Sequence, residues 1–199
     1  NQERGEDEYH GVGGPLNVKD VNSAMPIHGK FIDAGVQAGY PYNPDFNGIE
    51  QEGVGPIQLT KIGNKRCSAA RGYLTPIRDR KNLTVETNAR LTRIVIEDGR
   101  ATGVEYLHNG EAKRVSAAKE VLLCAGAVQS PQLLKLSGIG NPEELATHGI
   151  DCVHKLLGVG ENLQDHLDIV VQFHAEASAT LQKFSKWYNV AYAGIRYLL

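Results

Sequence analysis

The sequence predicts a mixed α/β fold, on three observations. Two Asx-Gly pairs separate alternating apolar segments between residues 82 and 118, a pattern typical of an antiparallel β-meander. A continuous apolar run follows in residues 119–125, and residues 126–140 then carry the proline and glycine signals that delimit a short helix. We therefore expect a sheet with at least one buried strand and helices that cover it.

The first 70 residues are rich in Gly, Pro and Asn, as in HGVGGPLN, GYPYNPDFNG and EGVGP. Such residues interrupt regular structure, so this part predicts loops laid over a scaffold, where substrate contacts are common. An irregular surface segment without such contacts is equally compatible with the composition. One helix is expected around residues 26–39, where Ile27, Phe31, Ala34 and Ala38 recur at helical spacing.

The meander is predicted from residue 82 onward. NLTVET alternates Leu83 and Val85 with polar residues, and the segments RLTRIVIE, ATGVEYL and EAKRVSA continue the strand pattern. Asp98-Gly99 and Asn109-Gly110 are expected to form tight turns between them, because both pairs accept positive φ angles.

Residues 119–125 are predicted to be a different kind of strand. The run KEVLLCA lacks alternation, which indicates burial on both faces of a parallel α/β sheet, with Cys124 as a small core residue. Its end, Ala125-Gly126-Ala127, would bring the main chain to the carboxyl edge of that sheet. Small residues there let a ligand approach the backbone closely.

The helix after this strand is predicted from its end signals. Ser130 is the expected N-cap, Pro131 the first helical residue and Gly138 the stop. The side chains expected to bury the helix are Leu133, Leu134 and Leu136. A strand, a small-residue turn and a capped helix are typical of a nucleotide-facing edge, and equally of ordinary helix–sheet packing.

A second helix is predicted by the same signals. Asn141 is the expected N-cap, Pro142 the first residue and Gly149 the stop, with Glu143 and Glu144 in the first turn.

Composition narrows the class of partner. The net charge of −2 with interspersed signs favours neither nucleic acid nor an anionic membrane, so we expect a small molecule or a protein as partner. Cys67, Cys124 and Cys152 lack CxxC spacing, which favours reduced thiols and a cytoplasmic location. No His or Cys pair has metal-ligand spacing, so no metal site is expected, and the apolar runs are shorter than a membrane span.

Both ends of the sequence suggest an internal fragment. The chain begins without Met, and it ends within an amphipathic helical pattern that carries Phe184, Trp187, Ala191, Ile195 and Leu198. We expect that helix to dock on its own domain. Attachment to a membrane surface, such as peripheral association with the inner membrane, or to a partner is the alternative.

The fifteen letters GAVQSPQLLKLSGIG, residues 126–140, resemble the second signature of the glucose-methanol-choline family of flavin oxidoreductases at every restricted position. Other segments resemble landmarks of that family in the family's order: YHGVGGPL (9–16), DFNG (45–48), RCSA (66–69), NLTV (82–85), GVE (103–105) and GVGENLQDH (158–166). Within that family, the sequences of these motifs are most similar to the bacterial choline dehydrogenase and alcohol dehydrogenase branch.

The resemblance implies a two-lobed enzyme. Residues 76–165 would belong to a Rossmann-like FAD-binding lobe, and residues 1–75 and 166–199 to an antiparallel-sheet substrate-binding lobe. The family's Gly-x-Gly-x-x-Gly loop and its catalytic His near the C-terminus have no counterpart in these letters, so we expect no catalytic residue in this chain and no activity from it alone. The counterpart of His166 in the family is structural.

The resemblance also implies FAD as the cofactor and assigns residues near it. Leu91 matches the family position, usually Val, whose main chain meets the adenine. Ala125, Gly126 and Ala127 would pack beside the dinucleotide, and Ser130 would orient the helix start.

The implied reaction is the oxidation of an alcohol carbon, in choline or a primary alcohol, by hydride transfer to the flavin. A flavin-containing lyase of the same family and a non-catalytic interaction module remain alternatives. The substrate, the electron acceptor and homo-oligomerisation stay open at this point.

Overall fold

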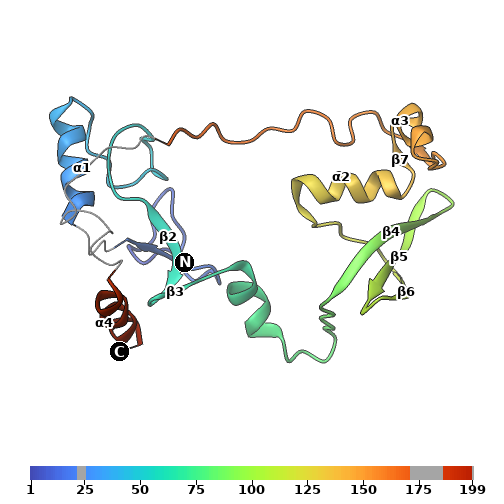
Figure 1. The fold of residues 1–199 in the computed structure, drawn as a ribbon, viewed down its shortest axis with the longest axis horizontal. Coiled ribbons are helices and arrows are strands. Elements are labelled where there is room, and N and C mark those ends of the chain that lie inside the picture. Colours follow the sequence, from blue (N-terminus) through green and yellow to red (C-terminus); the bar gives the residue numbers. More distant parts are fainter. Residues whose placement is uncertain (22–25, 171–185, 199) are drawn as a thin grey trace. The chain divides into compact units, whose positions relative to one another are not determined.

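The computed structural model of the 199-residue chain describes residues 1–21, 26–170 and 186–198. The chain forms two compact units, each with its own sheet (Figure 1). The first unit contains residues 1–84 and the described C-terminal residues, and the second contains residues 85–170. The predicted mixed α/β class with antiparallel sheets is confirmed.

The first unit has a three-stranded antiparallel sheet in the order β1-β2-β3. Its strands are β1 (Val18–Asp20), β2 (Gln58–Ile62) and β3 (Lys65–Arg66). The predicted helix is present as α1 (Pro26–Gln37), and two short helical turns follow the sheet at Ala70–Leu74 and Thr75–Ile77. The loops between these elements agree with the Gly, Pro and Asn content.

Side-chain amides hold the loops of the first unit together. Asn17 Nδ2 donates to the Lys61 carbonyl at 2.8 Å, and Asn43 Nδ2 donates to the Glu50 and Glu52 carbonyls at 2.8 and 3.1 Å. Both asparagines are buried. Backbone hydrogen bonds within the loops satisfy some of their polar groups, and these amides satisfy carbonyls that a sheet would otherwise pair.

The second unit contains the predicted meander of β4 (Ala89–Glu97), β5 (Arg100–His108) and β6 (Glu111–Ser116). Asp98-Gly99 and Asn109-Gly110 form its two-residue turns, with positive φ at all four residues. The prediction of a strand in NLTVET is wrong, because the ladder starts at Ala89. Alternation makes a segment suitable for a strand, but residues 82–87 have no strand to pair with in the described chain.

The prediction of a buried parallel strand in residues 119–125 is also wrong. The segment has no sheet pairing, Leu122 is 77% exposed and Cys124 is exposed. A strand in a parallel sheet needs a neighbouring strand to pair with, and the long strands of this unit, β4, β5 and β6, pair with one another instead.

The helix that follows is α2 (Gly126–Leu136), and its start corrects the prediction. Gly126, at φ +88°, turns the chain into the helix before Ser130 is reached, so Ser130 is not the N-cap and Pro131 lies inside the helix. Of the three leucines, Leu133 is buried, Leu134 is half-buried and Leu136 is 44% exposed. Gly138 ends the helix at φ +82°, as predicted.

The remaining elements are short. The strands β7 (Ile139–Gly140) and β8 (His154–Lys155) form a parallel pair, and α3 (Pro142–Thr147) lies between them in the chain. Its predicted cap is confirmed, since Asn141 Oδ1 accepts from the Glu143 N–H at 3.0 Å.

The C-terminal helix is α4 (Trp187–Leu198), which confirms the helical pattern there, while Phe184 lies outside the described residues. Trp187 is 81% exposed. In the part of the chain that the structure describes, no helix is long and apolar enough to span a bilayer.

Candidate functional site

A groove of about 790 Å³ lies between β4 and α2 in the second unit. It brings together Leu91 and Ala125, two of the residues predicted to contact the cofactor. The rest of its lining is mostly apolar: Ala89, Arg90, Thr92, Leu122, Leu123, Cys124, Gln129, Gln132, Leu133 and Leu136. Strand and helix thus form opposite walls, and the extended segment before α2 contributes a third.

The wall on β4 is shaped by an irregularity in the ladder. The register shifts between Leu91 and Arg93, so Thr92 is the extra residue of a β-bulge, and its hydroxyl donates to the Glu105 carbonyl at 2.9 Å. Bulges bend a strand and redirect its side chains. This bulge lies directly beside Leu91, and both residues line the groove.

The wall on α2 is held against β4 by packing and by one side chain. The helix packs on the strand, and the buried Ser137 Oγ accepts a hydrogen bond from the Ile94 N–H at 2.8 Å. Leu133, one turn earlier, is also buried. The sequence around Ser137 does not indicate this role, because its partner Ile94 is distant in the chain.

The other predicted residues lie around the start of α2. Ser130 Oγ accepts from the Ala125 N–H at 3.1 Å and so fixes the residue that enters the groove. A side chain at Gly126 would meet nothing within 4 Å, so glycine is needed there for its positive φ and not for space. Ala127 does not line the groove beside Leu91 and faces a second one instead.

The second groove, of about 730 Å³, lies on another side of α2. Its polar lining includes Lys135 and Glu144, which form an ion pair with Nζ 2.6 Å from Oε1. His148 and Glu161 also line it. The loop at Gly160 packs so closely on Lys135 that a Cβ there would lie 3.1 Å from Nζ. Sequence reasoning did not predict this groove, which depends on three segments meeting.

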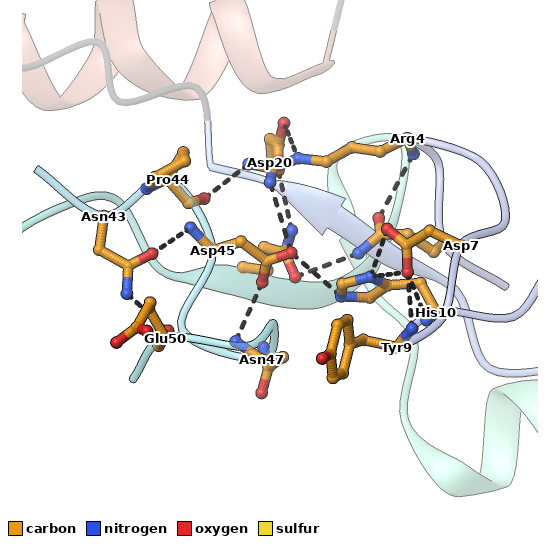
Figure 2. A network of polar contacts seen from close by, with 12 residues as sticks. Arg4, Asp7, Tyr9, His10, Asp20, Asn43, Pro44, Asp45, Asn47 and Glu50 are labelled. Carbon is orange, nitrogen blue, oxygen red and sulfur yellow. Dashed lines mark hydrogen bonds and ion pairs between the residues drawn. The ribbon is translucent and has the colours of Figure 1, made fainter. Parts of the chain in front are cut away.

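A polar network in the first unit centres on His10 and Asp45 (Figure 2). The His10 side chain is only 9% exposed, with Nδ1 at 2.8 Å from Asp7 and Nε2 at 3.1 Å from Asp45. The second contact is an ion-pair distance without hydrogen-bond alignment. His10 thereby joins two loops that are separated in the chain, and the loop sequences alone did not indicate that they meet.

Arg4 extends this network. It pairs with Asp20 at 2.8 Å and donates to the Pro44 carbonyl at 2.9 Å (Figure 2). The hydrogen bond from Arg4 lowers the pKa of Asp20, and the Tyr9 N–H, followed by the His10 side chain, lowers the pKa of Asp7. These contacts fix the loops of the first unit to one another.

His166, which ends the GVGENLQDH segment, is exposed, and its backbone N–H donates to Asp165 Oδ1 at 2.8 Å. In the described ranges, no group of three or more His, Cys, Asp and Glu residues could hold a metal ion.

Comparison with known proteins identifies the family. The profile of the family described as GMC oxidoreductase matches residues 2–168. The chain belongs to the GMC oxidoreductase family. The resemblance stated from the signature residues is therefore confirmed, and the grooves on both sides of α2 belong to the segment of a GMC oxidoreductase that carries this signature.

A bacterial relative is similar over nearly the whole chain. The oxygen-dependent choline dehydrogenase 1 of Chromohalobacter salexigens is 48% identical over 198 residues, which cover 98% of this chain and 35% of that protein. The chain therefore spans about a third of the length of that curated relative.

Solved structures agree with this family. Pyridoxine 4-oxidase from Mesorbium loti matches 77% of this chain and 30% of its own, with a TM-score of 0.72 and 35% identity. An FAD-dependent oxidoreductase from Chaetomium thermophilum matches 77% of this chain and 27% of its own, with a TM-score of 0.72 and 26% identity.

Proposed function

We propose that this chain is part of an FAD-dependent oxidoreductase that oxidises a CH–OH group, in choline or a primary alcohol, by hydride transfer to the flavin. One observation carries the proposal: in a GMC oxidoreductase chain, Leu91 and Ala125 line one groove next to α2, the helix that begins the signature residues 126–140. The similarity to a choline dehydrogenase supports the alcohol class of substrate.

The residues of the groove fit such a cofactor. Its leucine side chains suit a flat aromatic ring, and Gln129 and Gln132 add amides for polar atoms. At Gly126 the main chain is open, since nothing lies within 4 Å of where a Cβ would be. Leu91 and Ala125 in the groove, with Gly126 next to Ala125 at the start of α2, would therefore hold the dinucleotide, and bound FAD would supply the redox chemistry.

The remaining segments take supporting roles in this proposal. Residues 1–75 and 166–199 form part of the substrate-binding lobe, and residues 76–165 part of the FAD-binding lobe. In the first unit the His10 network fixes the loop around Asp45, which gives a wall of that lobe a defined shape. We assign no catalytic base to the described residues, so the chain alone is expected to be inactive.

The test uses the complete gene product that carries these residues. Its visible spectrum is recorded without oxygen before and after addition of choline or a primary alcohol. A flavin spectrum that bleaches with one substrate supports the proposal. A flavin that stays oxidised while product forms indicates a lyase, and a protein that does not bind FAD indicates an interaction module; either result overturns the proposal.

A pair of variants tests the groove itself. Leu91→Glu places a charge on its apolar wall, and we expect the FAD dissociation constant to rise at least about tenfold, the factor that corresponds to roughly 1.4 kcal/mol. Val115→Glu is the control, because Val115 is exposed on β6 and does not line the groove. Equal FAD affinity of both variants would contradict the assignment.

A further inference from the structure

We propose that Ser137 is a positioning residue for the cofactor groove, in which its hydroxyl joins α2 to β4 and so sets the distance between the two walls. This inference rests on the proposed function, because it takes the groove beside Leu91 as the place where FAD binds.

The hydroxyl of Ser137 is buried and has two partners. It donates to the Leu133 carbonyl at 2.6 Å and accepts from the Ile94 N–H at 2.8 Å. Ser137 is 5% exposed, as is Ile94. Without the hydroxyl, the Ile94 N–H would be a buried donor with no partner, and such groups destabilise the arrangement that buries them.

The two partners of Ser137 lie on the elements that form the walls. Leu133 belongs to α2 and lines the groove, and Ile94 belongs to β4, which contributes Leu91. The bulge at Thr92 lies between Ile94 and Leu91, so the hydroxyl holds the strand on one side of the bulge while the groove opens on the other. A shift of β4 along α2 would therefore move Leu91 relative to Ala125.

The position of Ser137 is also constrained by the packing of the next residue, Gly138, on a third segment of the chain. Gly138 has φ +82°, and a Cβ there would lie 2.6 Å from the Asp151 carbonyl oxygen. The backbone at Gly138 thus packs closely on Asp151 and Val153, and the Val153 N–H donates to the Gly138 carbonyl at 2.8 Å, which opposes movement of Ser137 with a displaced strand. The hydroxyl is thus a fixed point from which the register between helix and strand is set.

The test compares Ser137→Ala with Asn141→Ala in the complete gene product. Asn141→Ala removes another hydrogen bond between a backbone N–H and a side-chain oxygen in the same unit, the exposed cap from the Glu143 N–H, and Asn141 does not line the groove. We expect Ser137→Ala to raise the FAD dissociation constant about tenfold, as loss of one buried hydrogen bond predicts, and Asn141→Ala to change it less than about twofold.

A further readout separates positioning from general destabilisation. At saturating FAD, the circular dichroism of the bound flavin should change in Ser137→Ala and stay that of the wild type in Asn141→Ala, because only Ser137 joins the two walls of the groove. Unchanged FAD affinity in Ser137→Ala, or an equal loss in Asn141→Ala, would overturn the role of Ser137.

A measurement on the wild type covers the case in which Ser137→Ala does not fold. If the hydroxyl contact and FAD binding are coupled, FAD must slow amide hydrogen exchange at Ile94, because coupling between sites is reciprocal. We expect a slowing of at least about fivefold at Ile94 and little change at Lys113 on β6. Bound FAD with unchanged exchange at Ile94 overturns this inference alone, whereas a wild type that does not bind FAD overturns the proposed function as well.

Discussion

At the scale of single residues, the glycines of the second unit answer different demands. Gly149 and Gly138 both have positive φ, at +68° and +82°, but only Gly138 is also closely surrounded. A side chain at Gly149 would meet nothing within 4 Å, whereas at Gly138 it would meet the Asp151 carbonyl and the Val153 side chain. The close contact holds the end of α2 against the residues that precede β8.

This difference predicts unequal costs for alanine. Gly149→Ala should lower the free energy of unfolding by about 1–2 kcal/mol, the cost of the left-handed conformation. Gly138→Ala adds a steric clash, so about 2–5 kcal/mol is expected. Urea denaturation followed by far-ultraviolet circular dichroism gives both values, and equal losses would show that the contact at Gly138 relaxes freely.

At the scale of elements, the meander is stabilised by polar contacts beyond its ladders. Tyr106 on β5 donates its hydroxyl hydrogen to Glu86 Oε2 at 2.6 Å, and His108 Nδ1 lies 2.9 Å from Glu86 Oε1. Glu86 precedes β4, so these contacts hold an unpaired segment against the sheet. They explain why residues 85–88 stay with the meander although they form no strand.

The hydrogen bond between Tyr106 and Glu86 makes the stability of the fold depend on pH. It lowers the pKa of Glu86 and raises the pKa of Tyr106. The contribution of Glu86 to stability is present above its ordinary pKa and is lost as pH falls through its lowered folded-state pKa. That of Tyr106 is present below its ordinary pKa and is lost as pH rises through its raised value.

We expect Glu86→Gln to return the pKa of Tyr106 toward its ordinary value, since the variant keeps an acceptor but loses the charge. Ultraviolet titration of the phenolate measures this, as the difference between each protein and the same protein with Tyr106→Phe. Glu97→Gln is the matched control, because Glu97 pairs with Arg114 and not with Tyr106. A Tyr106 titration that stays the same in Glu86→Gln would disprove the coupling.

At the scale of the whole molecule, residues 119–125 have the composition of a buried strand but no strand to pair with in the described residues. Their apolar run is typical of a strand covered on both faces, yet Leu122 is 77% exposed and the segment is unpaired. The chain spans about a third of its curated relative. We expect the complete gene product to supply the neighbouring strands.

Thiol reactivity tests this expectation. In the 199-residue chain Cys124 and Cys152 are exposed and Cys67 is buried, so two thiols should react rapidly with a thiol reagent and one slowly. In the complete gene product, the Cys124 thiol should react slowly with the reagent. Comparison with a Cys124→Ser variant identifies which reaction phase belongs to Cys124. Rapid reaction of Cys124 there would show that the segment stays uncovered.

The sequence by itself determined the features that depend on neighbouring residues. The turn at Asp98-Gly99, the cap at Asn141 and the helix end at Gly138 follow from φ preferences and side-chain bonds within a few positions. The family followed from a signature of consecutive residues, which is recognised by comparing sequences and needs no structure.

Only the tertiary structure decided which distant segments meet. It placed Leu91 beside Ala125, joined Ser137 to Ile94 and left residues 119–125 unpaired. It also showed that the helix begins at Gly126, whereas the sequence predicts a start at Ser130. The physical reason is that a hydrogen bond or an apolar contact needs a partner, and the partner of a residue far along the chain depends on packing, which local preferences do not encode.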